Sequence, residues 1–151
     1  MTAQQVLELV RQLFLGGVGT LCFGILFGIP RKCYLACAVT GAVGWLTYEL
    51  AVMLGIGAVT ANLLAAIPLT LLARIFAITL KAPVTVFLLC GIFPLVPGAG
   101  IYYTAYYFIQ NDNLQMAASA ADTVKIAAAL AIGISLVLGL PLPGPKARKD
   151  K

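Results

Sequence analysis

Two prolines and two glycines, Pro94, Pro97, Gly98 and Gly100, interrupt an otherwise apolar stretch of the sequence. A proline cannot donate to the helical hydrogen-bond ladder and its ring clashes with the preceding turn, while glycine tolerates non-helical dihedral angles. This spacing predicts a helix that breaks between Phe93 and Gly98. The amide and carbonyl groups freed by the break are costly in an apolar environment, so we expect them to face a polar cavity.

Such a break would place two electrostatically opposite helix ends at one depth. The half that begins near Gly98 presents free amides and the positive end of its dipole, which suit a carboxylate or another anion. The half that ends near Phe93 presents carbonyl oxygens, which suit a cation or an ammonium group. A zwitterionic amino acid would use both ends, and a small dicarboxylate would use the first end with another donor. A kinked helix that only packs against its neighbours is the alternative interpretation.

Four tyrosines follow the break. Tyr102 and Tyr103 lie nearest to it and are candidate ligands, whereas Tyr106 and Tyr107 fit the aromatic belt at a membrane interface. The predicted substrate-binding residues are Pro94, Pro97, Gly98, Gly100, Tyr102 and Tyr103.

The composition indicates that the bilayer is the solvent for these elements. Of 151 residues, 62% are hydrophobic and 10% are charged, and the mean hydropathy is +1.01, unlike a soluble domain. Five apolar segments reach the roughly 20 residues that a spanning helix needs, and they lack the alternation of barrel strands. The predicted spans are Leu7 to Phe27, Cys33 to Leu54, Val59 to Leu80, Val84 to Ile109 and Ala120 to Leu140. We predict an all-α polytopic membrane protein whose fourth span is broken near the midplane.

The distribution of cations predicts the orientation of these spans. Eight of the ten lysines and arginines follow the first, third and fifth spans or lie near their ends, namely Arg31, Lys32, Arg74, Lys81, Lys146, Arg148, Lys149 and Lys151. Because cations accumulate on the cytoplasmic side, the N-terminus is expected outside and the C-terminus inside. Residues 1–142 would form the five-helix domain and residues 143–151 a basic cytoplasmic tail. The same bias explains the net charge of +5 without nucleic acid.

Polar groups inside predicted spans are candidate functional positions, because they are costly in lipid unless paired. They are Glu49 in the second span and Asn62 and Arg74 in the third. The Glu49 carboxyl could carry a coupling proton or be hydrated near the outer headgroups, and Arg74 could reach the interface or contact the substrate. Two pairs spaced i, i+3, Glu8 with Arg11 and Asp122 with Lys125, are expected to be structural.

Enzymatic chemistry is not expected. The sequence has no histidine, which excludes His-based acid/base catalysis and the usual serine triad. Its cysteines, Cys22, Cys33, Cys37 and Cys90, lack the companions of a metal site and fit small apolar fillers. We expect no metal and no cofactor.

Two strings resemble a known family. "GIPRKCYLACAVTGAVGWLTYEL" from Gly28 to Leu50 and "LKAPVTVFLLCGIFPLVPGAGIYYTAYY" from Leu80 to Tyr107 are similar to the C-terminal half of threonine/serine exporters. That module also occurs as a separate five-helix protein beside a larger subunit. The resemblance implies roles for Pro94, Pro97, Gly98 and Gly100 in the break and for Gly41, Gly44 and Trp45 in the second span. Cys90 stands where a further proline is expected.

The resemblance implies a subunit of an ion-driven secondary transporter in the inner membrane. It would export threonine, serine or a related small carboxylate and act with a larger five-span subunit, the two halves forming an inverted repeat. A homo-oligomer remains open. The alternatives are a small-dicarboxylate exporter of the succinate type, a non-transporting assembly subunit and a channel.

Overall fold

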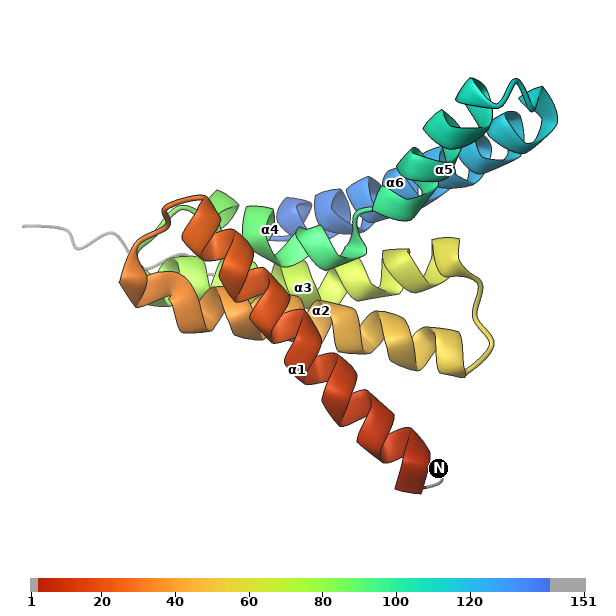
Figure 1. The fold of residues 1–151 in the computed structure, drawn as a ribbon. Helices are drawn as coiled ribbons and strands as arrows, with labels where there is room; N and C mark the ends of the chain where they lie inside the picture. Colours follow the sequence, from red (N-terminus) through yellow and green to blue (C-terminus); the bar gives the residue numbers. More distant parts are fainter. Residues whose placement is uncertain (1–2, 142–151) are drawn as a thin grey trace, which may run out of the picture.

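The computed structural model describes residues 3–141, and all the regular elements within that range are helices. Its six α-helices and two short 3-10 turns follow the order α1 Ala3–Leu26, η1 Arg31–Cys33, α2 Tyr34–Met53, α3 Ala58–Leu80, α4 Val84–Ile92, η2 Phe93–Leu95, α5 Gly98–Ile109 and α6 Asn113–Gly139 (Figure 1). The basic tail predicted for residues 143–151 lies outside the described residues.

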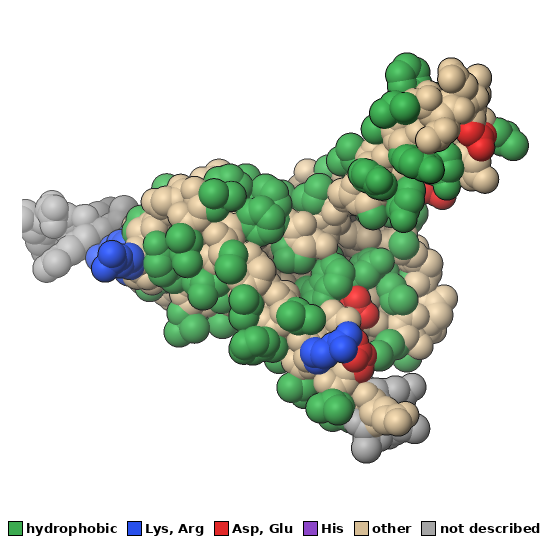
Figure 2. Space-filling model, in the orientation of Figure 1, with side chains coloured by type: hydrophobic (Ala, Val, Ile, Leu, Met, Phe, Trp, Pro, Cys, Tyr) green, Lys and Arg blue, Asp and Glu red, His purple; other side chains and the backbone are tan. Residues whose placement is uncertain are grey.

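The helices bear out the predicted all-α membrane architecture. Four stretches are long and apolar enough to span a bilayer by themselves, Val6–Leu26, Arg31–Met53, Ala58–Leu80 and Asn113–Gly139. A fifth crossing is available if Val84–Leu95 and Gly98–Ile109, which are bent by 54°, count as one broken span. In the space-filling view, hydrophobic side chains cover much of the surface and the charged ones gather in a few clusters (Figure 2).

The last helix begins at Asn113 rather than at the predicted Ala120. Its first turns contain polar residues, so the sequence pattern did not include them in an apolar span. Asp112 nevertheless caps the helix, because its side-chain oxygen accepts a hydrogen bond from the Gln115 amide at 3.1 Å. This cap satisfies one of the free amides of the first turn and sets the start of α6.

A left-handed residue follows four of the helices. After α1, the Gly28 amide bonds to the Ile25 carbonyl and the Ile29 amide to the Gly24 carbonyl, the pairing of a Schellman motif with a left-handed residue at its centre. The same pairing recurs after α2 and α5. After α3, the amides of Lys81 and Ala82 both bond to the Ala77 carbonyl. The left-handed residues are Gly28, Gly55, Lys81 and Asn111. The short turns recognised in the sequence are therefore helix stops that satisfy their own carbonyls.

Helices α2 and α3 form the centre of the molecule. Helix α1 packs along α2, α4 lies over α2 and α3, and α6 packs on α3 (Figure 1). Helix α5 packs mainly on α6, so the two form a hairpin that extends away from the α1–α2 pair (Figure 1). As a result, the break before α5 lies where this hairpin leaves the bundle.

Small residues let the central helices approach closely. A Cβ atom at Gly41 would collide with the buried Thr20 side chain of α1, and one at Gly44 would lie 2.7 Å from Cδ1 of Leu69 on α3. Gly41 and Gly44 are the glycines of the second span to which the resemblance assigns roles. Both face neighbouring helices of the same chain, so their contacts here are internal.

The buried apolar residues form two clusters. One joins η1, α2, α3 and α4 around the fully buried Phe87 and includes Cys33, Cys37 and Cys90. These three cysteines are buried as expected, whereas Cys22 is exposed on α1. The second cluster, with Leu69, Leu95 and Leu130, ties α3 and α6 to the turn before the break. The turn that precedes the break is thus held in place by packed side chains.

Candidate functional site

The predicted break is present and Pro97 sets its geometry. Helix α4 continues through the 3-10 turn Phe93–Leu95, and the chain then becomes extended at Val96, with ψ at 131°. A residue that precedes proline is driven out of the α region by the proline ring. Pro94 acts differently, because Phe93 before it keeps helical angles. The second proline of the motif therefore separates the two half-helices.

The break leaves several backbone groups without partners. The Gly98 amide turns back to the Val96 carbonyl at 2.7 Å, and the first helical bond of α5 runs from the Ile101 amide to the Pro97 carbonyl at 3.1 Å. Within residues 3–141, the amides of Ala99 and Gly100 have no acceptor, and the carbonyls of Pro94 and Leu95 have no donor. Donors are thus available at the start of α5 and acceptors at Pro94 and Leu95, whereas the Phe93 carbonyl accepts the Val96 amide.

These groups border a cavity of about 300 Å³. Helix α2 contributes two aromatic side chains to its wall, α3 an amide and α6 an aliphatic chain. Its lining comprises Trp45, Tyr48, Asn62, Pro94, Leu95, Val96, Pro97, Gly98, Ala99, Gly100 and Ile126. No charged side chain belongs to this lining. The cavity can therefore offer hydrogen bonds and aromatic faces to a small solute, but no ion pair.

Asn62 is the buried polar side chain of the cavity. Only 4% of the residue is exposed. Its Nδ2 donates to the Ala58 carbonyl at 2.9 Å, while its Oδ1 has no partner among the described residues. An acceptor buried in this way costs about 1–3 kcal/mol. The sequence marked Asn62 only as a polar group inside a span, and the structure places it beside the break.

A chain of polar contacts supports Trp45 from α1. The indole Nε1 donates to Oε1 of Gln12 at 3.0 Å, and Nε2 of Gln12 donates to Oε1 of Glu8 at 2.9 Å. Glu8 also pairs with Arg11 at 2.9 Å, as the sequence predicted. The Trp45 ring stacks on Tyr48 with their centroids 5.4 Å apart. Sequence reasoning missed Gln12, although its i, i+4 spacing from Glu8 was a visible signal.

Tyr102, Tyr103 and Glu49 do not line the cavity in this structure. Tyr102 and Tyr103 are 63% and 49% exposed on α5 and stack along that helix on Tyr106 and Tyr107. Glu49 is half-buried on α2, directly after Tyr48. Their proposed roles as ligands and as a coupling carboxyl stay predictions, whereas Pro94, Pro97, Gly98, Gly100 and Asn62 come together.

Arg74, on α3, lies away from the cavity, and its side chain reaches the C-terminal end of α6. Its guanidinium donates through Nη1 to the Val137 carbonyl and through Nη2 to the Leu140 carbonyl, the latter at 2.6 Å. The Val137 carbonyl also accepts the Leu140 amide at 3.3 Å, so the guanidinium adds a second donor there. A cation at this position also complements the helix dipole. Arg74 therefore joins α3 to the end of α6.

Replacing Arg74 with glutamine should lower the stability of the protein by about 1–2 kcal/mol, because two charge-assisted hydrogen bonds at a helix end are lost. Thermal unfolding of the detergent-purified protein measures this effect, with Lys125→Gln as the control, since its exposed partner Asp122 offers a screened contact at 3.1 Å. An unchanged melting temperature together with lost transport would instead place Arg74 in the transport cycle.

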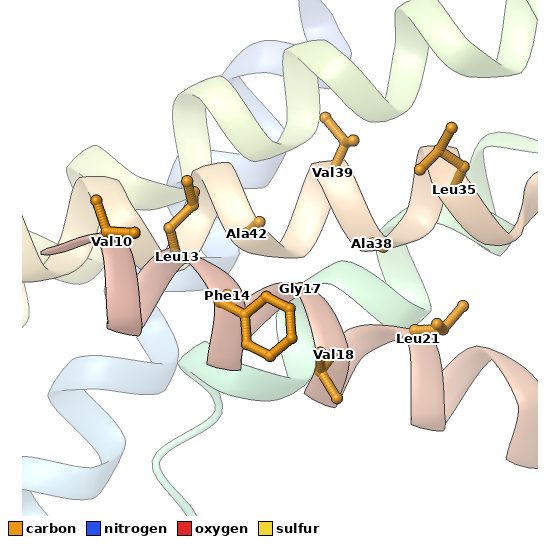
Figure 3. A pocket seen from close by; sticks show the side chains of 10 residues that line it. All are labelled: Val10, Leu13, Phe14, Gly17, Val18, Leu21, Leu35, Ala38, Val39 and Ala42. Carbon is orange, nitrogen blue, oxygen red and sulfur yellow. The ribbon is translucent and has the colours of Figure 1, made fainter.

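A second hollow, between α1 and α2, is apolar. The groove between α1 and α2 has a volume of about 450 Å³ (Figure 3). Its lining side chains, among them Leu13, Phe14 and Val39, are all apolar, and Gly17 contributes only backbone. Such a surface suits a lipid acyl chain rather than a polar solute. Within residues 3–141, no cluster of three or more metal-ligating side chains occurs.

Comparison with known proteins gives one result. Residues 12–139 match the model of a family described as "Threonine/Serine exporter, ThrE". The match runs from the middle of α1 to the end of α6 and includes the break and every residue that lines the cavity. No curated protein and no solved structure matches the chain.

Proposed function

Because the chain belongs to the threonine/serine exporter family, we propose that it is a subunit of a secondary transporter that moves threonine, serine or a related small carboxylate out of the cell. An ion gradient would drive the movement. Glu49 is the candidate for carrying a coupling proton, since it is a half-buried carboxyl one residue from the cavity-lining Tyr48.

The cavity at the break is the observation that carries this proposal. Unpaired amides at the start of α5 can receive a carboxylate, and unpaired carbonyls of Pro94 and Leu95 can receive an ammonium group. Discontinuous helices with exposed ends form the solute sites of many secondary transporters. A small zwitterion therefore matches both the polarity and the neutrality of the lining.

We further propose that a larger five-span subunit covers the free faces of α5. Helix α5 has no buried residue of its own, and its tyrosine hydroxyls would be costly in hydrocarbon without partners. A partner of opposite orientation would complete an inverted repeat around the cavity. A second copy of this chain is the competing arrangement.

The expected orientation has the N-terminus outside and the C-terminus in the cytoplasm. In support, Nζ of Lys32 donates to the Leu80 carbonyl at 3.2 Å, which places the first and third loops at one end. Arg31, Lys32 and Lys81 share that end, whereas Asp112 lies in the loop between α5 and α6. The cationic end is assigned to the cytoplasm.

Efflux measurements test the proposed function. Cells that express the chain alone, or with a co-encoded larger five-span protein, are loaded with labelled threonine, serine or succinate. Saturable threonine or serine efflux that requires both proteins and a proton gradient is the expected result. Succinate efflux would identify a dicarboxylate exporter, efflux by the chain alone a homo-oligomer, and non-saturable downhill movement a channel. If both proteins insert in the membrane and no efflux occurs, the remaining interpretation is a non-transporting assembly subunit.

Replacing Gly98 with valine should abolish this efflux without affecting insertion. A Cβ atom at Gly98 meets no atom within 4 Å, so the fold can accept the side chain, yet Gly98 lines the cavity and its new methyl groups would occupy that space. Gly19→Val is the matched control, because Gly19 also has open space and lies on α1 away from the cavity. Equal efflux by both variants would show that solutes do not pass Gly98.

A further inference from the structure

The orientation of the Asn62 amide is fixed by its own helix. Nδ2 donates to the Ala58 carbonyl one turn earlier, at 2.9 Å. The atom left over is therefore Oδ1, which can only accept hydrogen bonds. This oxygen has no partner among the described residues, and water does not reach it in this conformation.

A buried acceptor without a donor destabilises the protein, and native structures contain few of them. Asn62 is 96% buried and lines the cavity beside the break. Alternating access requires the cavity to open and admit a solute. If it opens on the α3 side, a donor group of that solute can reach the Asn62 oxygen. The unmet acceptor thus points to a ligand that carries N–H groups.

The rest of the lining favours the same kind of ligand. The acceptors of the cavity, Oδ1 of Asn62 and the carbonyls of Pro94 and Leu95, come from two elements, whereas the free donors come from the start of α5. Trp45 and Tyr48 add aromatic rings, which attract cations. No charged side chain lines the cavity, so a dianion would enter without a cationic partner.

We propose that Asn62 is a specificity-determining residue that accepts a hydrogen bond from the α-ammonium group of the transported amino acid. The inference rests on the proposed function and assigns to one side chain the recognition of the amino group. The start of α5 holds the carboxylate, and Asn62 together with the Pro94 and Leu95 carbonyls holds the ammonium. A hydroxy acid of the same size lacks the donor and leaves these acceptors unpaired, which a polar site penalises strongly.

The test compares threonine with 3-hydroxybutyrate, which is threonine without its amino group. Efflux of each labelled compound is measured over a range of internal concentrations, from cells that express the complete transporter. The wild type should show an apparent KM for threonine at least about tenfold below that for 3-hydroxybutyrate. Asn62→Leu should raise the threonine KM by that factor, leave the 3-hydroxybutyrate KM in place and so remove the preference.

A second variant separates recognition from a structural role. Asn62→Asp keeps an acceptor in the cavity, and its ionised carboxylate cannot donate to the Ala58 carbonyl. It should retain the preference for threonine. If the bond to Ala58 were the whole role of Asn62, aspartate and leucine would impair efflux of both solutes alike. Membrane insertion and thermal stability of each variant are recorded in parallel.

The outcomes distinguish failure of the role proposed for Asn62 from failure of the proposed transport function. Loss of the preference in Asn62→Leu and its retention in Asn62→Asp support the role of Asn62. Unchanged threonine KM in Asn62→Leu overturns that role and leaves the exporter intact. A wild type that exports succinate but not threonine also overturns it, while transport itself stands. Export of none of the solutes by the inserted wild type overturns the proposed function, and the inference with it.

Discussion

Replacing Pro97 with alanine is expected to abolish export while making the protein more stable. Without the proline ring, Val96 can leave its extended conformation, in which ψ is 131°, and join α4 to α5. In the continuous helix the amides of Gly98, Ala99 and Gly100 would pair with the carbonyls four residues earlier. Those acceptors include the unpaired groups of Pro94 and Leu95.

The gain in stability and the loss of function have one cause. Pro97 stands at the N-cap of α5, outside both half-helices, so the gain comes from the new backbone bonds, which satisfy polar groups in the bilayer. The same bonds remove the free donors and acceptors that border the cavity, and the 54° bend that opens it would be lost. A solute would then meet no polar backbone there.

Pro68→Ala serves as the control for this substitution. Pro68 lies inside α3, a helix that continues through it, and it does not line the cavity. Its replacement should also raise stability but should leave export in place. Efflux per inserted protein and melting temperature in detergent are measured for both variants. A Pro97→Ala protein that is more stable and still exports would show that transport does not need the break.

The sequence was sufficient for the features that are set locally. Helix stops follow from glycine, lysine and asparagine at left-handed positions, and the break follows from the ring of Pro97, which acts on the neighbouring Val96. Long apolar runs fix the number of spans, although the polar first turns of α6 hid its start at Asn113. These features depend on residues close together in the chain, so they can be predicted without the fold.

The composition of the cavity could not be predicted in the same way. The dihedral angles of Val96 and Pro97 set the rotation of α5, and small changes there decide whether Tyr102 faces the cavity or the exterior. Asn62 reaches the break only because α3 packs beside α4. Likewise, Arg74 meets α6 more than 60 residues along the chain, and no local pattern specifies such a contact.

Replacing Gly133 with alanine should destabilise the protein by about 2–3 kcal/mol, toward the upper end of the usual cost of overpacking. Helix α6 crosses α3 closely at this point, and a Cβ atom would lie 2.6 Å from Cβ of Ala66 and 2.9 Å from the Leu63 carbonyl oxygen. A backbone oxygen cannot rotate away, so the two helices would have to separate. The α3–α6 contact also holds Ile126 at the cavity wall, so export should fall as well.

Gly139→Ala on the same helix is the control, and we expect it to leave stability unchanged or to raise it. No atom lies within 4 Å of a Cβ atom at Gly139, and alanine is favoured over glycine in a helix by about 0.5–1 kcal/mol. Its melting temperature should equal or exceed that of the wild type, whereas that of Gly133→Ala should fall by several degrees. Equal stability of the two variants would mean that α3 and α6 separate without cost, and the cavity would then lack the rigid wall that solute recognition by Asn62 requires.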